Sequence, residues 1–200
     1  MDDIRIETHP FKPFLPDNAR LLMLGTFPPA ARRWCMEFYY PNFTNDMWRI
    51  FGICFYGDKM YFVNQEAKTY RIDAIKPFLQ ERGIAMYDTA TRIIRTKNTA
   101  SDKDLEIVEP TDLDAMLCRL SRCVAVVTAG QLATEVFCRR FGVVMPKVGE
   151  YSEFEFVPSA GGISRMVRLY RMPSSSRAYP MKVEDKAAYY GRVFSWLGMI

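Results

Sequence analysis

The stretch "RLLMLGTFPP" (Arg20–Pro29) joins a short apolar run to a turn. The run from Leu21 to Leu24 is shorter than a typical helix and is followed by Gly25, which is typical of a buried strand. The two prolines that close the stretch fix the backbone of the turn and supply no N–H donors. We therefore predict a central strand that ends in a rigid turn.

Three other segments are similar in composition to this strand, and helical patterns lie between them. The predicted strands are Gly83–Asp88, Cys123–Gly130 and Met166–Pro173. The predicted helices fall within Asn64–Arg82, Leu113–Leu120 and Val183–Leu197. Apolar residues recur in these helical segments at a spacing of three to four residues. Alternating strands and helices predict right-handed crossovers and a parallel sheet that is covered on both faces.

The segment Glu153–Tyr170 has a different pattern, in which two alternating stretches flank a Gly-rich loop. This pattern predicts a β-hairpin that leads into the last strand. The sequence therefore predicts an α/β fold, a three-layer α/β/α arrangement with a central four-stranded, mostly parallel sheet plus a β-hairpin. The 200 residues suit a single domain, 1–200.

Composition narrows the class of protein. Apolar residues make up 49% of the chain, which is enough for a core, and no apolar run is long enough to span a membrane. The acidic start "MDDIRIETHP" does not resemble a signal peptide, and the five cysteines form no CxxC pair. These features predict a cytoplasmic protein with reduced thiols. The net charge of +4 suits nucleic acid, and equally an ordinary surface with a slight basic excess.

His9 is the only histidine of the chain, and it lies near the N-terminus beside a proline. Mechanisms that need an internal histidine as a base, such as Ser-His-Asp and Cys-His sites, are therefore disfavoured. A metal site rich in histidine is disfavoured for the same reason.

The predicted strands end in small, polar or turn-forming residues. These ends are Gly25–Pro29, Asp88–Thr89, Thr128–Gly130 and Pro173–Arg177. In open α/β sheets, ligands bind at the carboxyl ends of the strands. We therefore expect the four ends to form one site, although Thr128 and Gly130 equally suit close packing of strand and helix.

Four segments together resemble motif regions of the uracil-DNA glycosylase superfamily. They are "LLMLGTFPP" with "YYPNFTNDMWRIFG", "GIAMYDTATRIIR", "TAGQLA" and "MPSSSRAYP", in the order of the family, from Arg20 to Leu197. The pattern is most similar to the hypoxanthine/uracil (deoxyinosine) DNA glycosylase branch. Phe27 stands where many members carry an acidic or amide residue, and Met172 stands where other branches carry a histidine.

The resemblance implies that Asn45, shortly before Trp48, positions the attacking water. Cleavage of an N-glycosidic bond builds positive charge on the sugar and negative charge on the departing base, and an amide can orient water without deprotonating it. Local sequence alone favours Asn45 as a helix N-cap, and the two roles are compatible. Asp46 is the second candidate for activating water, and it also suits the dipole of a helix start.

The resemblance also implies a pocket for the base at the first turn and the second strand end. Its candidate residues are Gly25, Thr26, Phe27, Pro28, Tyr40 and Asp88. Tyr40 would stack on the base, with Phe38, Tyr39 and Phe43 as rivals, although ordinary core packing suits each of these aromatics. Asp88 would accept a hydrogen bond from the base edge, or it would cap a helix that begins at "TATRII".

The last motif implies DNA binding. Ser174, Ser175 and Ser176 carry small hydroxyls that suit phosphate contacts, and Arg177 would bind phosphate or fill the space left by a flipped base. An ordinary polar loop is the alternative for these four residues.

The resemblance implies a monofunctional DNA glycosylase that removes hypoxanthine or uracil in base-excision repair. Its partner would be DNA containing a damaged base, and it would be a monomer with no metal, no cofactor and no membrane association. Two alternatives stay open. The first is a non-catalytic protein that binds nucleic acid or a nucleobase on the same fold, and the second is a small-molecule nucleoside hydrolase.

Overall fold

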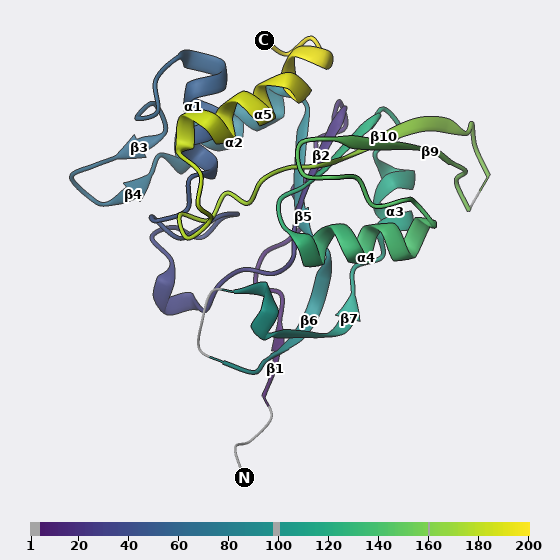
Figure 1. Ribbon diagram of the computed structural model, residues 1–200, viewed down its shortest axis with the longest axis horizontal. Helices are drawn as coiled ribbons and strands as arrows, with labels where there is room; N and C mark the ends of the chain where they lie inside the picture. The colour runs from purple at the N-terminus through teal and green to yellow at the C-terminus, as the bar shows by residue number, and fades with distance from the viewer. Residues whose placement is uncertain (1–4, 98–100, 160) are drawn as a thin grey trace.

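The computed structural model describes residues 5–97, 101–159 and 161–200. Its centre is a five-stranded sheet in the order β5-β2-β8-β10-β9 (Figure 1). The strands are β2 (Leu21–Gly25), β5 (Ile84–Asp88), β8 (Ala125–Thr128), β9 (Tyr151–Phe156) and β10 (Arg165–Arg171). All neighbours from β5 to β10 are parallel, and β9 pairs antiparallel with β10. The sheet thus has one strand more than the predicted four.

The additional strand is the first arm of the predicted hairpin. Arg165 pairs with Phe156 and Tyr170 pairs with Tyr151, so the hairpin is confirmed. Ala160, within the Gly-rich loop, lies outside the described residues. The four predicted strands are confirmed within one to two residues at most ends, because short apolar runs that are buried on both faces are typical of parallel sheets.

Helices cover both faces of the sheet. They are α1 (Met47–Tyr56), α2 (Ile72–Arg82), α3 (Leu113–Arg119), α4 (Gln131–Phe141) and α5 (Val183–Trp196). The connection from β2 to β5 runs in one direction along the sheet, and the connections from β5 to β8 and from β8 to β10 run in the other. Right-handed crossovers therefore put α1 and α2 on one face and α3 and α4 on the opposite face. Helix α5 packs against α1 (Figure 1).

The contact between α1 and α5 forms a large part of the core. Trp48, Phe51, Tyr190 and Phe194 are fully buried, and the rings of Phe51 and Phe194 are 5.2 Å apart. Burial of each such side chain stabilises the fold by roughly 1.5–3 kcal/mol. This contact fixes the start of α1, where the candidate residue Asn45 lies, relative to the last helix.

The helix predicted within Asn64–Arg82 is confirmed, but it occupies only the second part of this range. The strands β3 (Val63–Asn64) and β4 (Thr69–Tyr70) form a small antiparallel hairpin. Helix α2 therefore begins only at Ile72. The side chain of Asn64 accepts a hydrogen bond from the Ala67 N–H, which favours a turn over a helix at this point.

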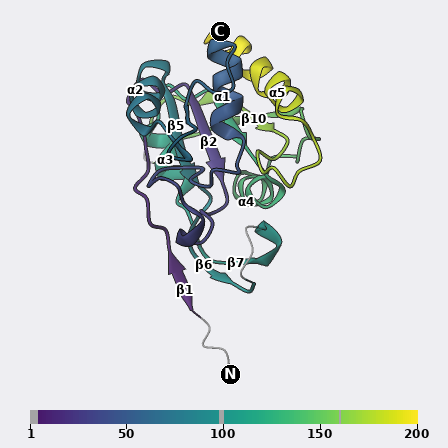
Figure 2. The same cartoon turned by 90° about the vertical axis from the view of Figure 1, so that its left-hand side faces the viewer.

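The alternative in which Asp88 caps a helix at "TATRII" is wrong. This segment is β6 (Ala90–Arg95), which pairs with β1 (Ile6–Thr8) and β7 (Leu105–Pro110) in a separate three-stranded sheet. Threonine and isoleucine are β-branched and favour strands. Because β6 follows β5 almost directly, the small sheet projects beyond the carboxyl end of β5 (Figure 2). Two short 3₁₀ helices, η1 (Ala31–Arg33) and η2 (Asp102–Asp104), lie in the connections.

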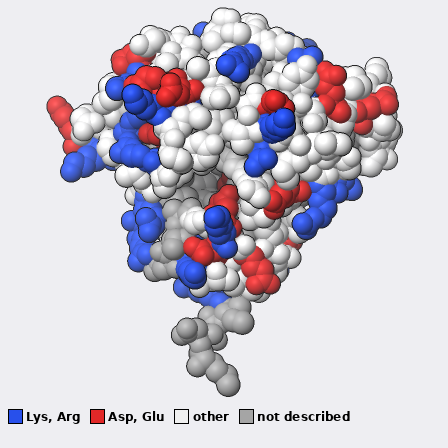
Figure 3. Space-filling view, viewed as in Figure 1, with Lys and Arg blue, Asp and Glu red and all other residues white. Residues whose placement is uncertain are grey.

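The surface carries charges of both signs. Figure 3 shows that Lys and Arg side chains alternate with Asp and Glu side chains on the face seen in Figure 1, without one dominant basic patch. Within the described ranges, no helix has both the length and the apolar character needed to cross a bilayer.

Candidate active site

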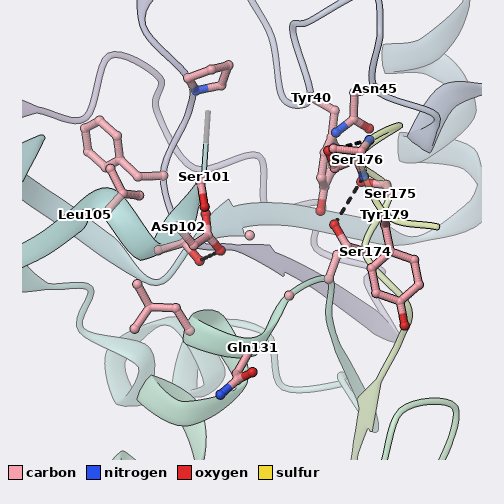
Figure 4. Close-up of a pocket in the computed structure, with 18 of the residues that line it drawn as sticks. Tyr40, Asn45, Ser101, Asp102, Leu105, Gln131, Ser174, Ser175, Ser176 and Tyr179 are labelled. Carbon is pink, nitrogen blue, oxygen red and sulfur yellow. Dashed lines mark hydrogen bonds between the residues drawn. The ribbon is translucent and has the colours of Figure 1, made fainter. Parts of the chain in front are cut away.

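A cavity of about 1010 Å³ lies where the parallel strands end (Figure 4). Each of the four predicted strand ends contributes to its wall, through Gly25–Pro29, Asp88, Ala129–Gly130 and Pro173–Ser176. The expected convergence of these ends is therefore confirmed. Ten of the twelve candidate site residues line the cavity, and Asp46 and Arg177 do not.

Asn45 lies in the cavity wall immediately before α1. Its side-chain oxygen accepts a hydrogen bond from the Met47 N–H at 2.9 Å, so Asn45 caps the first turn although Asp46 is the boundary residue of the helix. Its backbone carbonyl accepts hydrogen bonds from buried Arg49 and from the Tyr70 hydroxyl. No described residue is a hydrogen-bond partner of the Asn45 Nδ2 amide. The cap thus holds the side chain by its oxygen and leaves the amide nitrogen for a ligand.

Asp46 has a different environment from the one expected of a residue that activates water. Its carboxylate is buried, lies 2.9 Å from the Lys186 Nζ, and is 3.6 Å from the Arg177 Nε. Lys186 is fully buried in α5 and also donates to the Ser176 carbonyl at 2.8 Å. Asp46 therefore joins α1, α5 and the last loop, and its placement outside the cavity corrects the expectation for this residue.

The loop Ser174–Arg177 runs beside the start of α1. Asn45 and Ser176 form an isolated antiparallel bridge, and the Asp46 N–H donates to the Ser175 carbonyl at 2.8 Å. Ser174 and Ser176 accept backbone hydrogen bonds within the loop, and Ser175 is buried. All three serines line the cavity (Figure 4). Arg177 does not line it and instead pairs with the Asp46 carboxylate. The first and last motifs are thus joined by backbone hydrogen bonds and an ion pair.

Asp88 lies at the end of β5 and lines the cavity. Its Oδ2 is 2.9 Å from the Nε2 of His9, whose side chain is only 2% exposed. A Cβ on Gly25 would lie 2.3 Å from the Asp88 Oδ1, so the first turn requires glycine where it meets this carboxylate. Since β6 follows, Asp88 does not cap a helix.

His9 was missed as a residue of the site. The sequence places it near the N-terminus and 79 residues from Asp88, so no local pattern connects the two. The structure packs its ring against Phe27 and Tyr87, with ring centroids at 5.2 and 4.7 Å. The histidine therefore contacts the Asp88 carboxylate without lining the cavity itself.

Asp102 was also missed. It belongs to η2, between β6 and β7, and its Oδ2 accepts a hydrogen bond from the Thr26 hydroxyl at 2.7 Å. Burial raises the pKa of the Asp102 carboxyl. Figure 4 shows Asp102 across the cavity from Asn45 and the serine loop. No sequence motif marks Asp102, because only the β6–β7 pairing brings it to the first turn.

The four aromatic candidates divide into two groups. Tyr39 and Tyr40 line the cavity, whereas Phe38 and Phe43 do not. Tyr40 has a φ of +52°, a conformation that is uncommon for residues other than glycine. The Tyr40 hydroxyl is buried and has no hydrogen-bond partner among the residues that the structure describes. Strain and an unpaired polar atom together are typical of a functional position.

In the described parts of the chain, no group of three or more His, Cys, Asp or Glu residues is arranged to hold a metal ion.

Comparisons with known proteins identify the fold. No family model and no curated protein matches the sequence. The structure is similar to the solution NMR structure of a "putative Uracil DNA glycosylase" from Methanosarcina acetivorans, with a TM-score of 0.64 and 20% sequence identity. The match covers 97% of this chain and 99% of that one. The two proteins therefore share one fold over nearly their whole length.

Proposed function

We propose that this protein is a monofunctional DNA glycosylase of the uracil-DNA glycosylase superfamily, which removes a deaminated base, hypoxanthine or uracil, in base-excision repair. The observation that carries the proposal is Asn45 in the wall of a cavity at the strand ends, where its oxygen caps α1 and its Nδ2 has no partner among the residues that the structure describes. The shared fold with the protein from Methanosarcina acetivorans supports it.

The dimensions of the cavity suit a flipped nucleotide. A base within a duplex is inaccessible, so the enzyme must rotate the nucleotide out of the stack. Pockets for small ligands have volumes of roughly 300–1,000 Å³, and this cavity of about 1010 Å³ is at the upper end of that range. It therefore has room for a base together with its sugar.

The residues of the wall have distinct roles in the proposed reaction. The Asn45 amide orients water toward the sugar carbon, and N–H groups of the turn at Thr26 and Phe27 stabilise the negative charge of the leaving base. Asp88 accepts a hydrogen bond from an N–H on the base edge, and Tyr40 stacks on the base. The serine loop contacts phosphate. Asp46 holds α1 to α5 and takes no part in the chemistry.

Base release tests the proposal directly. Duplex and single-stranded oligonucleotides that carry one uracil or one hypoxanthine are incubated with the protein, and abasic sites are then cleaved with alkali. We expect cleavage at the modified base. DNA binding without cleavage on any substrate would contradict the proposal and favour a binding protein, and turnover of free nucleosides alone would favour a nucleoside hydrolase.

The role of Asn45 is tested by Asn45→Ala. We expect base release to fall roughly 10²–10³-fold, the usual cost of removing one positioned polar group from an active site, while affinity for DNA is retained. Asn18→Ala is the matched control, because Asn18 is an exposed asparagine that bonds the Gln80 carbonyl outside the cavity wall. Wild-type release by Asn45→Ala would exclude Asn45 as the residue that positions water.

The monofunctional class is tested separately. Lys103 lines the cavity, and a lysine amine that attacked the sugar would form a Schiff base. Incubation with borohydride would trap that adduct as a covalent protein–DNA species. We expect none, and a trapped species that disappears in Lys103→Met would show a bifunctional enzyme.

A further inference from the structure

The connection between β6 and β7 brings the Asp102 carboxyl to the cavity. Asp102 belongs to none of the motifs recognised in the sequence. Asp102 lines the cavity, and its Oδ2 accepts the Thr26 hydroxyl hydrogen at 2.7 Å. A Cβ on Gly130 would lie 3.2 Å from the same oxygen. The carboxyl therefore lies between the ends of β2 and β8, where it is held by the turn that follows β2.

This position is the topological switch point of the sheet. Strands β2 and β8 are neighbours, and the connections that leave them run in opposite directions, to β5 and to β10. Ligands of open α/β sheets bind in the crevice between two such strand ends. Asp102 therefore lies beside the crevice in which a ligand of this sheet would bind.

The surroundings raise the pKa of the Asp102 carboxyl above its ordinary value. Burial raises the pKa of Asp102, the Thr26 hydrogen bond lowers it, Asp88 raises it, and Arg95 lowers it. The other charged residues of the cavity wall are Lys103, Glu135 and Arg171. Because Thr26 donates to Oδ2, and no described residue bonds Oδ1, a proton on Oδ1 is available to a ligand.

We propose that Asp102 is the general acid for release of a purine base, so that hypoxanthine is the substrate for which this site is built; this inference rests on the proposed glycosylase activity. Asp102 lies across the cavity from Asn45 (Figure 4), and its Oδ2 is bonded to Thr26, one of the residues proposed to contact the base. Water and leaving base would thus occupy opposite sides of the sugar, as in inverting glycosidases.

In the reaction, the proton on Asp102 Oδ1 moves to the N7 nitrogen of hypoxanthine. The electron pair of the C1′–N9 bond goes to the base, which leaves as a neutral purine. Water held by Asn45 bonds to C1′ and releases a proton to solvent, and Asp102 regains a proton from solvent. Uracil differs, because its anion spreads charge over two carbonyl oxygens and leaves without prior protonation. The acid is therefore required for the purine and dispensable for the pyrimidine.

The test compares two bases in two variants under single-turnover conditions. Asp102→Asn keeps the shape and an acceptor for Thr26 but has no acidic proton. Glu106→Gln is the matched control, since it removes one negative charge from an exposed residue of the same hairpin. We expect Asp102→Asn to slow hypoxanthine release on the order of 10²–10⁴-fold, the usual contribution of a general acid, and to slow uracil release less than about tenfold, with duplex affinity unchanged.

A pH profile distinguishes an acid from a merely structural residue. Wild-type hypoxanthine release should decline as pH rises through the pKa of Asp102, the uracil rate should lack this decline, and Asp102→Asn should abolish it. Asp102→Glu, which keeps an acid, should recover part of the hypoxanthine rate.

Three results would overturn the inference: equal losses on both bases in Asp102→Asn, an unchanged hypoxanthine rate, or a wild-type protein that releases uracil but not hypoxanthine. None of these three results contradicts the proposed glycosylase activity. Failure of the wild-type protein to release either base would contradict that activity itself.

Discussion

At the scale of single residues, the first turn depends on the glycine that precedes it. Gly25 meets the Asp88 carboxylate, and an added Cβ would lie 2.3 Å from the Asp88 Oδ1. Gly25→Ala therefore displaces either the turn or a side chain of the cavity wall. We expect a loss of unfolding free energy of about 1–3 kcal/mol, as for overpacked sites, measured by denaturant titration.

Gly191→Ala is the control for this prediction. Gly191 lies inside α5, and its nearest neighbour would be the Cys54 Sγ at 3.8 Å, which is an ordinary contact. Since alanine favours the helical conformation more than glycine does, the free energy of unfolding of this variant should rise by roughly 0.5–1 kcal/mol. If Gly25→Ala were as stable as the wild type, the close approach to Asp88 would be excluded.

Asp102 has a consequence for stability as well as for chemistry. Burial raises the pKa of this carboxyl in the folded state, so the folded protein holds the proton at pH values where the unfolded chain has lost it. Stability therefore falls as pH rises from the ordinary Asp pKa, about 3.9, through the raised value, and the loss is complete above it.

Asp102→Asn removes the ionisable group and with it this loss of stability at higher pH. We expect the variant to be more stable than the wild type at neutral pH, and the difference to vanish below about pH 3.9, the ordinary pKa of Asp. Thermal unfolding across this range measures the effect, and Glu106→Gln should show no such dependence. A variant that is less stable than the wild type at every pH would mean that the carboxylate is stabilising.

At the scale of elements, one buried ion pair joins the start of α1, the serine loop and α5. Lys186 is fully buried and donates to both Asp46 and the Ser176 carbonyl. Lys186→Met leaves the Asp46 carboxylate without its buried partner. We expect a loss of about 3–5 kcal/mol, the usual cost of breaking a buried pair, measured by chemical denaturation.

The exposed pair of Lys59 and Glu184 is the matched control. Its atoms are 3.3 Å apart and both side chains are more than half exposed. Lys59→Met should therefore change stability by no more than about 1 kcal/mol. The double variant Asp46→Asn with Lys186→Met should recover part of the unfolding free energy that Lys186→Met loses. If the losses of the two single variants simply add in the double variant, the two residues are not directly coupled.

At the scale of the whole molecule, the distribution of charge limits how strongly DNA can be held by its phosphates. The net charge is only +4, and the face seen in Figure 3 carries both signs. Proteins that make 6–10 phosphate contacts lose roughly 10³–10⁵ in affinity between 50 and 200 mM salt. We expect a smaller loss here, measured by fluorescence anisotropy with duplex DNA, because few phosphates are neutralised. A steeper dependence would reveal a basic surface on another face.

The sequence by itself determined the four parallel strands, the helices between them, the hairpin, and the strand ends that meet at the cavity. These features follow from local patterns, since apolar runs, helical spacing and turn residues act over a few neighbouring residues. Asn45 was also recognisable as a helix cap, whereas Tyr40 and the serine loop were proposed because their motifs resemble those of the uracil-DNA glycosylase superfamily.

Only the tertiary structure decided how residues that are distant in sequence share the site. His9 reaches Asp88 across 79 residues, and Asp102 reaches Thr26 across 76 residues. Asp46 was separated from the cavity by an ion pair with Lys186, 140 residues away. Pairing between β1, β6 and β7 and packing of α5 on α1 create these contacts, and no local pattern encodes them. The cap at Asn45 could therefore be predicted from the sequence. The partners of the Asp46, Asp88 and Asp102 carboxyls could not, because they come from distant parts of the chain.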